Sequence, residues 1–270
     1  MPELPEVETV KRGLQMMVDD TIAAVDVRFP RLRYPLDREK LNLAQNQKIL
    51  SISRRAKYLI IHLDHGYIII HLGMSGKVTL YKKSNTPEII KHDHVDIITN
   101  NHVLRYNDAR RFGCVIYSLE LSSLDMLNTL GPEPFSEEFN AEYLFSKISK
   151  RKIPIKQLIM DNAIVVGVGN IYACESLFLC NISPLRLGNE ITLDECYKLI
   201  NIIQQVLTKA IEAGGSSLRD YRDAEGNLGY FQQSHFVYGR AKQECKICST
   251  HISEIRLGQR NSFYCPNCQL

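Results

Sequence analysis

Four cysteines near the C-terminus constrain the fold of this 270-residue chain more than any other feature. Two residues separate Cys245 from Cys248 and Cys265 from Cys268, and sixteen residues lie between the two pairs. Such pairs can supply the four thiolates of a tetrahedral zinc site. The segment 236–270 is too short to bury a stable core, whereas a structural zinc contributes about 10–16 kcal/mol to units of this size. We therefore predict one structural zinc on a small C-terminal hairpin, and unligated thiols are the alternative.

The spacing alone does not define the function of this zinc hairpin. A closed four-cysteine site leaves no open coordination position for catalysis. Between the cysteine pairs lie Arg256, Arg260 and Asn261, of which Arg260 is the best candidate for a phosphate contact. The motif is therefore compatible with nucleic-acid binding and with many other roles.

Composition narrows the class of protein further. The formal net charge of +3 gives no bulk excess of positive charge, so a basic surface would require local clusters. No apolar run reaches the ~18 residues of a membrane span. The N-terminal Met1-Pro-Glu-Leu-Pro-Glu carries acids where a signal peptide carries Lys or Arg. We expect a protein of the reducing cytoplasm, in which the scattered cysteines are buried apolar residues rather than disulfides. These are Cys114, Cys174, Cys180 and Cys196.

Hydrophobic periodicity divides the chain into three parts. Leu4, Val7, Val10 and Leu14 recur at helical spacing, which predicts a helix almost at the N-terminus. Short strand-like runs follow up to about residue 121 without helices between them, and this favours an antiparallel β-sandwich. The expected strands are Tyr58–Leu63, Tyr67–Leu72, Lys77–Tyr81, His94–Ile98 and Val115–Leu119. The expected helices of the next part are Glu137–Lys150, Pro154–Asp161, Asn170–Leu179 and Leu193–Ala213. A polar, glycine-containing loop is expected over Leu218–Gln233.

Pro2 has two interpretations. If the initiator methionine is removed, Pro2 carries a free secondary amine, and an α-amino group titrates near pH 7.7–8.0, against about 10.4 for lysine. Such an amine can attack a sugar C1′ to give an iminium, with the adjacent Glu3 moving protons. The alternative is that Pro2, Glu3 and Glu6 are ordinary residues of a helix start. Taken alone, the second interpretation is stronger.

Several further motifs change that balance, because they occur together and in order along nearly the whole chain. They are Met1-Pro-Glu-Leu-Pro-Glu-Val-Glu-Thr-Val, Lys57, His71-Leu-Gly-Met-Ser-Gly, Asp108-Ala-Arg-Arg-Phe-Gly, Asp161-Asn162, Val166-Gly-Val-Gly-Asn-Ile-Tyr and Gln259-Arg260. With the cysteine spacing, this set resembles bacterial formamidopyrimidine-DNA glycosylase. The resemblance implies a bifunctional glycosylase and abasic-site lyase of base excision repair, which removes 8-oxoguanine and ring-opened purines and cleaves by β,δ-elimination. It also implies one structural Zn²⁺.

The resemblance implies an α+β fold with the domains 1–130, 131–235 and 236–270. These would be a catalytic β-sandwich with flanking helices, a helix–two-turns–helix domain with the lesion loop, and a zinc-binding β-hairpin. DNA would lie between the two main parts. The chain would act as a monomer on double-stranded DNA containing oxidised purines or abasic sites, in the bacterial cytoplasm at the nucleoid and without a membrane.

Matching positions carry the family's site residues over to this sequence. Pro2 would form the Schiff base, Glu3 would donate the proton for base release, and Lys57 and Arg260 would assist elimination and bind phosphate. The expected DNA contacts are His71, His92, Arg110, Arg151, Lys152 and Asn170. Met74, Arg110 and Phe112 would form the wedge that replaces an everted base. By themselves, Met74 and Phe112 are more often core residues, and a histidine or a basic run is more often solvated.

Two alternatives remain at this point. The endonuclease VIII branch shares the Pro2 chemistry but prefers oxidised pyrimidines, and its members usually begin Pro-Glu-Gly-Pro-Glu, whereas this chain has Leu4. A non-catalytic zinc protein would bind DNA without a covalent adduct. The departures from the family pattern are small: Ala109 stands where proline is common, and the turn near Asn100 is about one residue shorter than in some relatives.

Overall fold

The computed structural model describes residues 2–215 and 235–270, and the expected loop Leu218–Gln233 lies outside these residues. The chain divides into two compact units. Among described residues, the first unit comprises the chain up to Asn128 together with 213–215. The second unit comprises Thr129–Glu212 and 235–270. No helix within the described residues has the length and apolar character needed to cross a membrane.

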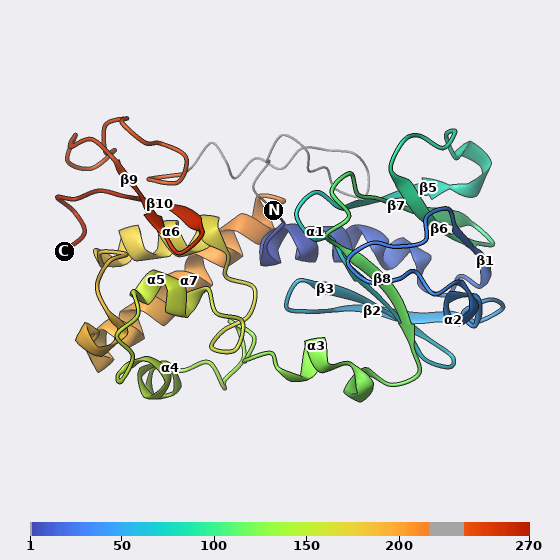
Figure 1. Ribbon diagram of the computed structural model, residues 1–270, viewed down its shortest axis with the longest axis horizontal. Coiled ribbons are helices and arrows are strands. Elements are labelled where there is room, and N and C mark those ends of the chain that lie inside the picture. The colour runs from blue at the N-terminus through green and yellow to red at the C-terminus, as the bar shows by residue number, and fades with distance from the viewer. Residues whose placement is uncertain (1, 216–234) are drawn as a thin grey trace. The chain divides into compact units, whose positions relative to one another are not determined.

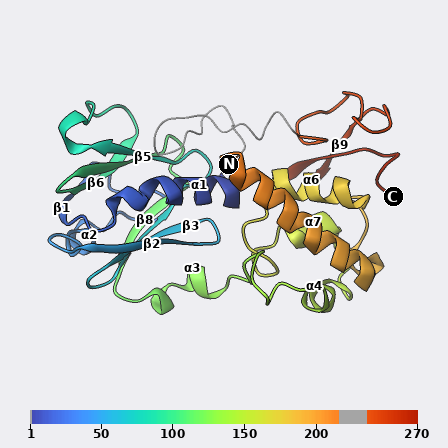
Figure 2. The same ribbon diagram turned by 180° about the vertical axis from the view of Figure 1, so that it is seen from behind.

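The first unit is built on two four-stranded antiparallel sheets (Figures 1 and 2). One sheet has the strand order β1-β6-β7-β5 and the other β2-β3-β4-β8. The strands are β1 Ile22–Val27, β2 Ile49–Arg55, β3 Tyr58–Leu63, β4 Tyr67–His71, β5 Lys77–Lys82, β6 Asp93–Thr99, β7 His102–Asn107 and β8 Cys114–Ser118. The helices are α1 Leu4–Leu14, α2 Arg38–Asn42 and α3 Asp125–Asn128, with short 3-10 turns at Gln15–Met17, Lys83–Asn85 and Leu121–Ser123.

One hydrophobic core joins the two sheets to helices α1 and α2. Helix α1 contributes Val7, Val10 and Leu14 to it, because residues three and four apart lie on the same helical face. Strands from both sheets contribute inward-facing aliphatic side chains, among them Ile61 and Leu104. The helix that carries the N-terminal residues is therefore fixed against the sandwich by the burial of its apolar face.

The second unit consists of helices and a two-stranded hairpin. Its elements are α4 Ala141–Ile148, α5 Ile155–Ile159, α6 Asn170–Cys180, a 3-10 turn at Gly188–Glu190, α7 Leu193–Glu212, β9 Ser253–Leu257 and β10 Arg260–Tyr264. The hairpin lies against α6 in both views (Figures 1 and 2). A two-residue turn joins its strands, since Leu257 pairs with Arg260. The predicted combination of antiparallel sheets, a helical part and a C-terminal hairpin is confirmed.

The structure adds three strands that the periodicity did not indicate, namely β1, β2 and β7. Strand β7 contains Arg105, which is buried but paired, because its guanidinium donates to both carboxylate oxygens of Asp96 on β6. A paired buried arginine interrupts the apolar alternation on which strand prediction relies. The helix expected from Glu137 begins only at Ala141, since the side chain of Asn140 accepts the backbone N–H of Tyr143 and caps it.

Candidate active site and metal centre

The four C-terminal cysteines form one cluster, in which all Sγ atoms lie within 4.8 Å of one another. Sγ–Sγ distances are 3.9 Å for Cys245–Cys268, 3.5 Å for Cys248–Cys265 and 3.4 Å for Cys248–Cys268. Tetrahedral zinc with Zn–S bonds of about 2.3 Å requires sulfurs about 3.8 Å apart. The cluster therefore fits one zinc ion, and the predicted metal ligands are brought together. The other four cysteines are buried and unbridged, as expected.

The zinc hairpin is joined to helix α6 by apolar and polar contacts. Cys174 and Phe178 of α6 share a buried cluster with Val237, Ile252 and the zinc ligand Cys265. The buried carboxylate of Glu175 accepts the backbone N–H groups of residues 236, 237 and 238 at 2.8, 3.0 and 2.8 Å. The first residues of the C-terminal segment are thus fixed to the helix.

Lys156 links three elements of the second unit. Its buried ammonium group donates to the side-chain oxygen of Asn170 and, at 2.6 Å, to Oγ of Ser262 on β10. Asn170, the first residue of α6, in turn donates from Nδ2 to the carbonyl of Asn261 at 2.9 Å. These bonds orient the Asn170 amide and leave its backbone N–H at the helix N-terminus, where amides favour anions.

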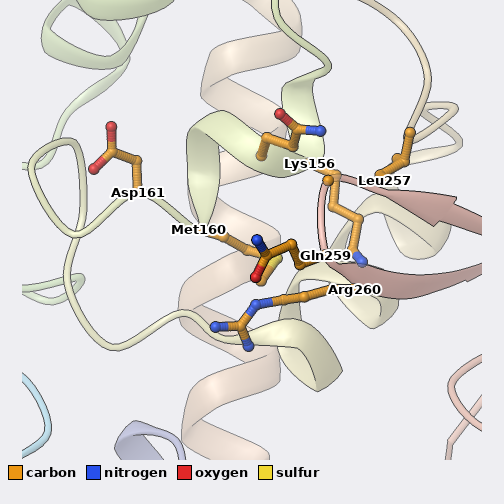
Figure 3. Close-up of a pocket in the computed structure, with 8 residues that line it drawn as sticks. Lys156, Met160, Asp161, Leu257, Gln259 and Arg260 are labelled. Atoms are coloured by element: carbon orange, nitrogen blue, oxygen red, sulfur yellow. The ribbon is translucent and has the colours of Figure 1, made fainter.

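A cavity of about 230 Å³ opens beside this network and is lined by Lys156, Gln157, Met160, Asp161 and residues 257–260. In Figure 3, Lys156 approaches from α5 while Gln259 and Arg260 approach from the hairpin turn, and the Asp161 carboxylate points away from the Arg260 guanidinium. Arg260 is exposed at the start of β10. The structure therefore places Arg260 and Asn170 in one region of the second unit.

The N-terminal residues lie at the start of α1 in the first unit. Pro2 and Glu3 are both buried, and Glu3 is the N-cap residue of the helix. The backbone N–H of Glu3 donates to the carboxylate of Glu6 at 2.8 Å. This bond fixes the peptide next to Pro2, so that Glu6 has a local role that the sequence motif did not reveal.

Lys57 lies half-buried in the turn between β2 and β3. Its neighbour Arg54 donates to Glu8 of α1 at 3.0 Å and to the carbonyl of Ala56 at 2.8 Å. Arg54 therefore ties the helix that carries Pro2 to the turn that carries Lys57. Both belong to the first unit.

His71 is neutral near pH 7. Burial, together with the smaller effect of the charges of Lys57 and Arg33, lowers its pKa from the ordinary value to about 4. The backbone N–H of Gly73 donates to Nδ1 at 3.0 Å, so the imidazole proton lies on Nε2. A phosphate contact by His71 would therefore be made by a neutral N–H donor.

Two neighbouring segments carry the expected wedge residues, and we call them the wedge turn (residues 72–76) and the wedge loop (residues 108–113). Met74 is 42% exposed and Phe112 is 47% exposed, so neither is a core residue. The exposed Arg110 lies over the Phe112 ring, with its Cζ 4.9 Å from the ring centroid. The alternative that Met74 and Phe112 are core residues is therefore wrong.

The remaining expected DNA contacts are distributed over both units. His92 lies before β6 with φ of 74° and intermediate exposure. Arg151 and Lys152 are exposed after α4, and Arg151 approaches Asp161 at 3.9 Å.

Two buried carboxylates, Glu175 and Asp108, were not predicted to have a role, because an acidic residue within a helix or a loop motif is usually solvated.

The fold and the thiolate cluster define a zinc-finger protein in which a four-cysteine hairpin is packed on a helical unit. Family models assign the parts: "Formamidopyrimidine-DNA glycosylase N-terminal domain" matches residues 1–115 and "Formamidopyrimidine-DNA glycosylase H2TH domain" matches residues 130–222. "Zinc finger found in FPG and IleRS" matches residues 242–270. The chain belongs to the formamidopyrimidine-DNA glycosylase family, an enzyme family of DNA repair.

Individual members of this family are similar to the chain over its full length. The formamidopyrimidine-DNA glycosylase of Haemophilus influenzae (strain PittEE) is 51% identical, and the alignment covers 100% of this chain and 99% of the relative. That of Escherichia coli O9:H4 (strain HS) is 49% identical with complete coverage of both. Among solved structures, the Fpg protein of Thermus thermophilus has a TM-score of 0.90 at 34% identity, covering 99% of this chain and 98% of that one. The Lactococcus lactis Fpg bound to DNA containing an abasic site has a TM-score of 0.88 at 34% identity, covering 99% of each chain.

Proposed function

We propose that this chain is a bifunctional DNA glycosylase and abasic-site lyase that removes 8-oxoguanine and formamidopyrimidines from duplex DNA. Family membership over the whole length carries the proposal, together with Pro2 and Glu3 at the buried start of α1. Lactococcus lactis Fpg has been crystallised with DNA containing an N7-benzylated Fapy-dG, which supports a ring-opened purine as a substrate. Removal of Met1 is a condition, because an acylated Pro2 nitrogen is an amide and not a nucleophile.

The first steps exchange the base for the enzyme. The lone pair of the Pro2 nitrogen attacks C1′, and the bond from C1′ to the base breaks with its electron pair leaving on the base. Glu3 passes to the departing base the proton that the Pro2 nitrogen loses. Glu3 delivers a proton to the sugar ring oxygen as the C1′–O4′ bond breaks, and the C1′=N⁺ iminium forms on the opened chain. A retained positive nitrogen at C1′ then makes C2′–H acidic.

The later steps break the strand twice. Loss of a C2′ proton expels the 3′ phosphate, and loss of a further proton along the conjugated chain expels the 5′ phosphate. Water finally hydrolyses the iminium and frees Pro2. Lys57 and Arg260 are proposed to hold the departing phosphates, with His71 and Asn170 as further phosphate donors. Both units would thus contact the DNA backbone, which gives affinity and register.

Recognition requires the damaged nucleotide to leave the stack. Met74 and Phe112 are exposed apolar side chains, and the guanidinium of Arg110 can pair with the orphaned base. His92, Arg151 and Lys152 are proposed to contact phosphates. In functional terms we propose three parts, with boundaries near residues 130 and 235, and zinc held by the four cysteines keeps the hairpin folded.

Borohydride trapping tests the proposal directly. Met-trimmed protein is mixed with a duplex containing 8-oxoguanine opposite cytosine, and sodium borohydride reduces any iminium to a stable crosslink. We expect a crosslink on the N-terminal peptide and excision that exceeds excision of thymine glycol. A matched protein with one residue retained before Pro2 should form at least about a hundredfold less crosslink, since its nitrogen is acylated.

The outcomes separate the parts of the proposal. The absence of a crosslink with the trimmed protein would overturn the enzymatic function. A crosslink on a lysine, or full trapping by Pro2→Gly, would overturn only the nucleophile. A strong preference for thymine glycol would move the substrate to oxidised pyrimidines, as in the endonuclease VIII branch.

A further inference from the structure

A single buried carboxylate lies beneath both segments that carry the wedge residues. Asp108 is 0% exposed, whereas Met74 and Phe112 are 42% and 47% exposed. We propose that Asp108 is a positioning residue that holds the wedge turn and the wedge loop together, so that the three wedge side chains enter DNA as one rigid body. This inference rests on the proposed function.

The carboxylate of Asp108 accepts four hydrogen bonds. Its Oδ1 accepts from Oγ of Ser75 at 2.6 Å and from the backbone N–H of Arg110 at 3.2 Å. Its Oδ2 accepts from the backbone N–H of Gly113 at 2.9 Å and from the hydroxyl of Tyr106 at 3.2 Å. Bonds to a buried charged acceptor are stronger than neutral ones, so this group fixes the loop on both sides of Phe112.

Ser75 connects the two segments. Its hydroxyl donates to Asp108 and accepts the backbone N–H of Arg110 at 3.1 Å. The wedge turn and the wedge loop are thereby joined through a closed set of three hydrogen bonds among Ser75, Asp108 and Arg110. Met74 directly precedes Ser75, so its backbone is held by the same set.

Glycines allow the two backbones to meet. Gly73 has φ of +63°, and a Cβ there would lie 2.5 Å from both the Gly113 nitrogen and the Phe112 carbonyl carbon. A Cβ at Gly113 would lie 1.9 Å from the Tyr106 hydroxyl. Side chains at these positions are therefore excluded, and the turn and the loop form one packed layer with Asp108 inside it.

The ends of the wedge loop are fixed independently of the Asp108 side chain. The N–H of Asp108 donates to the carbonyl of His92 at 3.1 Å, and its carbonyl bonds His94 Nε2 at 2.9 Å. The carbonyl of Gly113 accepts from the N–H of Arg33 at 3.0 Å. Changing the carboxylate should therefore loosen the residues between these ends without releasing the loop from the sandwich.

Rigidity matters because the energy needed to unstack a base step opposes entry of the wedge side chains. If the wedge turn and the wedge loop can bend away from the DNA, less of the binding energy is available to open the base pair. A carboxylate suits the position better than an amide, since all four partners donate and the N–H groups of Arg110 and Gly113 cannot reverse their role.

Asp108→Asn and Ser75→Ala test the inference. The first places an amide donor among donors, and the second removes only the link between the segments. Single-turnover excision of 8-oxoguanine from a duplex should fall roughly tenfold to a hundredfold for Asp108→Asn and less for Ser75→Ala. Fluorescence of 2-aminopurine beside the lesion should rise correspondingly more slowly. Borohydride trapping on a single-stranded abasic oligonucleotide, which has no base pair to open, should match the wild type within about twofold.

Asp20→Asn and Ser53→Ala are the matched controls. Asp20 is a buried carboxylate of the same unit that accepts from Thr99, Asn101 and His102, and Ser53 bonds the ring of His62. Both controls should retain duplex excision. The inference is overturned if Asp108→Asn and Ser75→Ala excise like the wild type, or if each variant loses duplex and single-strand reactions equally. If Asp108→Asn does not fold, Ser75→Ala decides alone. A wild type that fails to trap single-stranded abasic DNA instead overturns the proposed function.

Discussion

The wedge turn and wedge loop of the first unit and the zinc hairpin of the second both expose an arginine, but different interactions hold these segments in place. Each displays an exposed arginine at a tight bend, Arg110 in one and Arg260 in the other. Each has one buried ionisable side chain beneath it: Asp108 accepts four hydrogen bonds, and Lys156 donates to Asn170, Asn261 and Ser262. Only the hairpin adds a thiolate cluster.

This difference predicts how many residues lose their structure when Asp108 or the zinc ion is removed. The wedge segments extend from β4, β5, β7 and β8, which belong to a large sandwich core, so that loss of Asp108 should loosen a few residues. The zinc hairpin belongs to a small apolar cluster that includes two of the zinc ligands themselves, Cys245 and Cys265. Loss of the metal should therefore remove the fold of the whole hairpin.

Of the changes that distinguish the two regions, we expect removal of zinc to have the largest effect on stability. Chelation or Cys268→Ser removes a term of about 10–16 kcal/mol from a segment with little core of its own. Amide hydrogen exchange over β9 and β10 should become fast, and affinity for duplex DNA should fall with the loss of Arg260. Exchange of the wedge segments should not change. The prediction fails if the hairpin stays protected after metal analysis shows that zinc has gone.

Glu175→Gln should have an intermediate effect on the same hairpin. Three backbone N–H groups converge on the carboxylate, and glutamine offers one acceptor oxygen and a donor in its place. Bonds to a charged acceptor contribute about 1.5–3 kcal/mol each, so we expect a local loss of about 2–4 kcal/mol. Faster exchange of the amides of Phe236, Val237 and Tyr238 with zinc still bound is the measurement.

Glu195→Gln provides the control for this variant. Glu195 pairs with Arg186 on a half-exposed surface of the same unit, where an ion pair contributes about 0–1 kcal/mol. It should leave the exchange of residues 236–238 unchanged. Equal effects of both substitutions would show that Glu175 has no special anchoring role.

The two regions also differ in what the sequence could predict. The zinc site follows from ligand spacing within 24 residues (245–268), because a short segment must bring its own cysteines together. The helix α1 follows from periodicity. The wedge residues came from a family resemblance, and their exposure could not be read from periodicity because methionine and phenylalanine usually indicate core.

The roles of Asp108 and Glu175 could not be predicted, because they depend on contacts between segments that are distant in the sequence. Ser75 and Asp108 are 33 residues apart, and Glu175 lies about 60 residues before the amides it binds. These pairs meet only through strand register and helix packing. Likewise, strand β7 could be recognised only once Asp96 was known to neutralise Arg105.

His71 offers the smallest and most local test of the comparison, since it ends β4 directly before the wedge turn. Its folded-state pKa of about 4 lies below the ordinary value, so the unfolded chain binds more protons between about pH 4 and 6.5. Stability of the first unit should therefore rise with pH across that window, by at most about 1.4 kcal/mol per pH unit from this residue. His71→Asn should flatten the slope.

Imidazole ¹⁵N shifts give the direct measurement. From pH 5.5 to 8, Nδ1 should remain an unprotonated acceptor for the Gly73 N–H, and Nε2 should remain protonated. Below about pH 5, protonation of Nδ1 should break that bond and speed amide exchange in the wedge turn, because Gly73 loses its acceptor. Thiolates also protonate in acid, so exchange must be compared at a pH where zinc is still bound. A His71 that titrates near pH 6.5 would mean that the wedge turn is more open than its burial indicates.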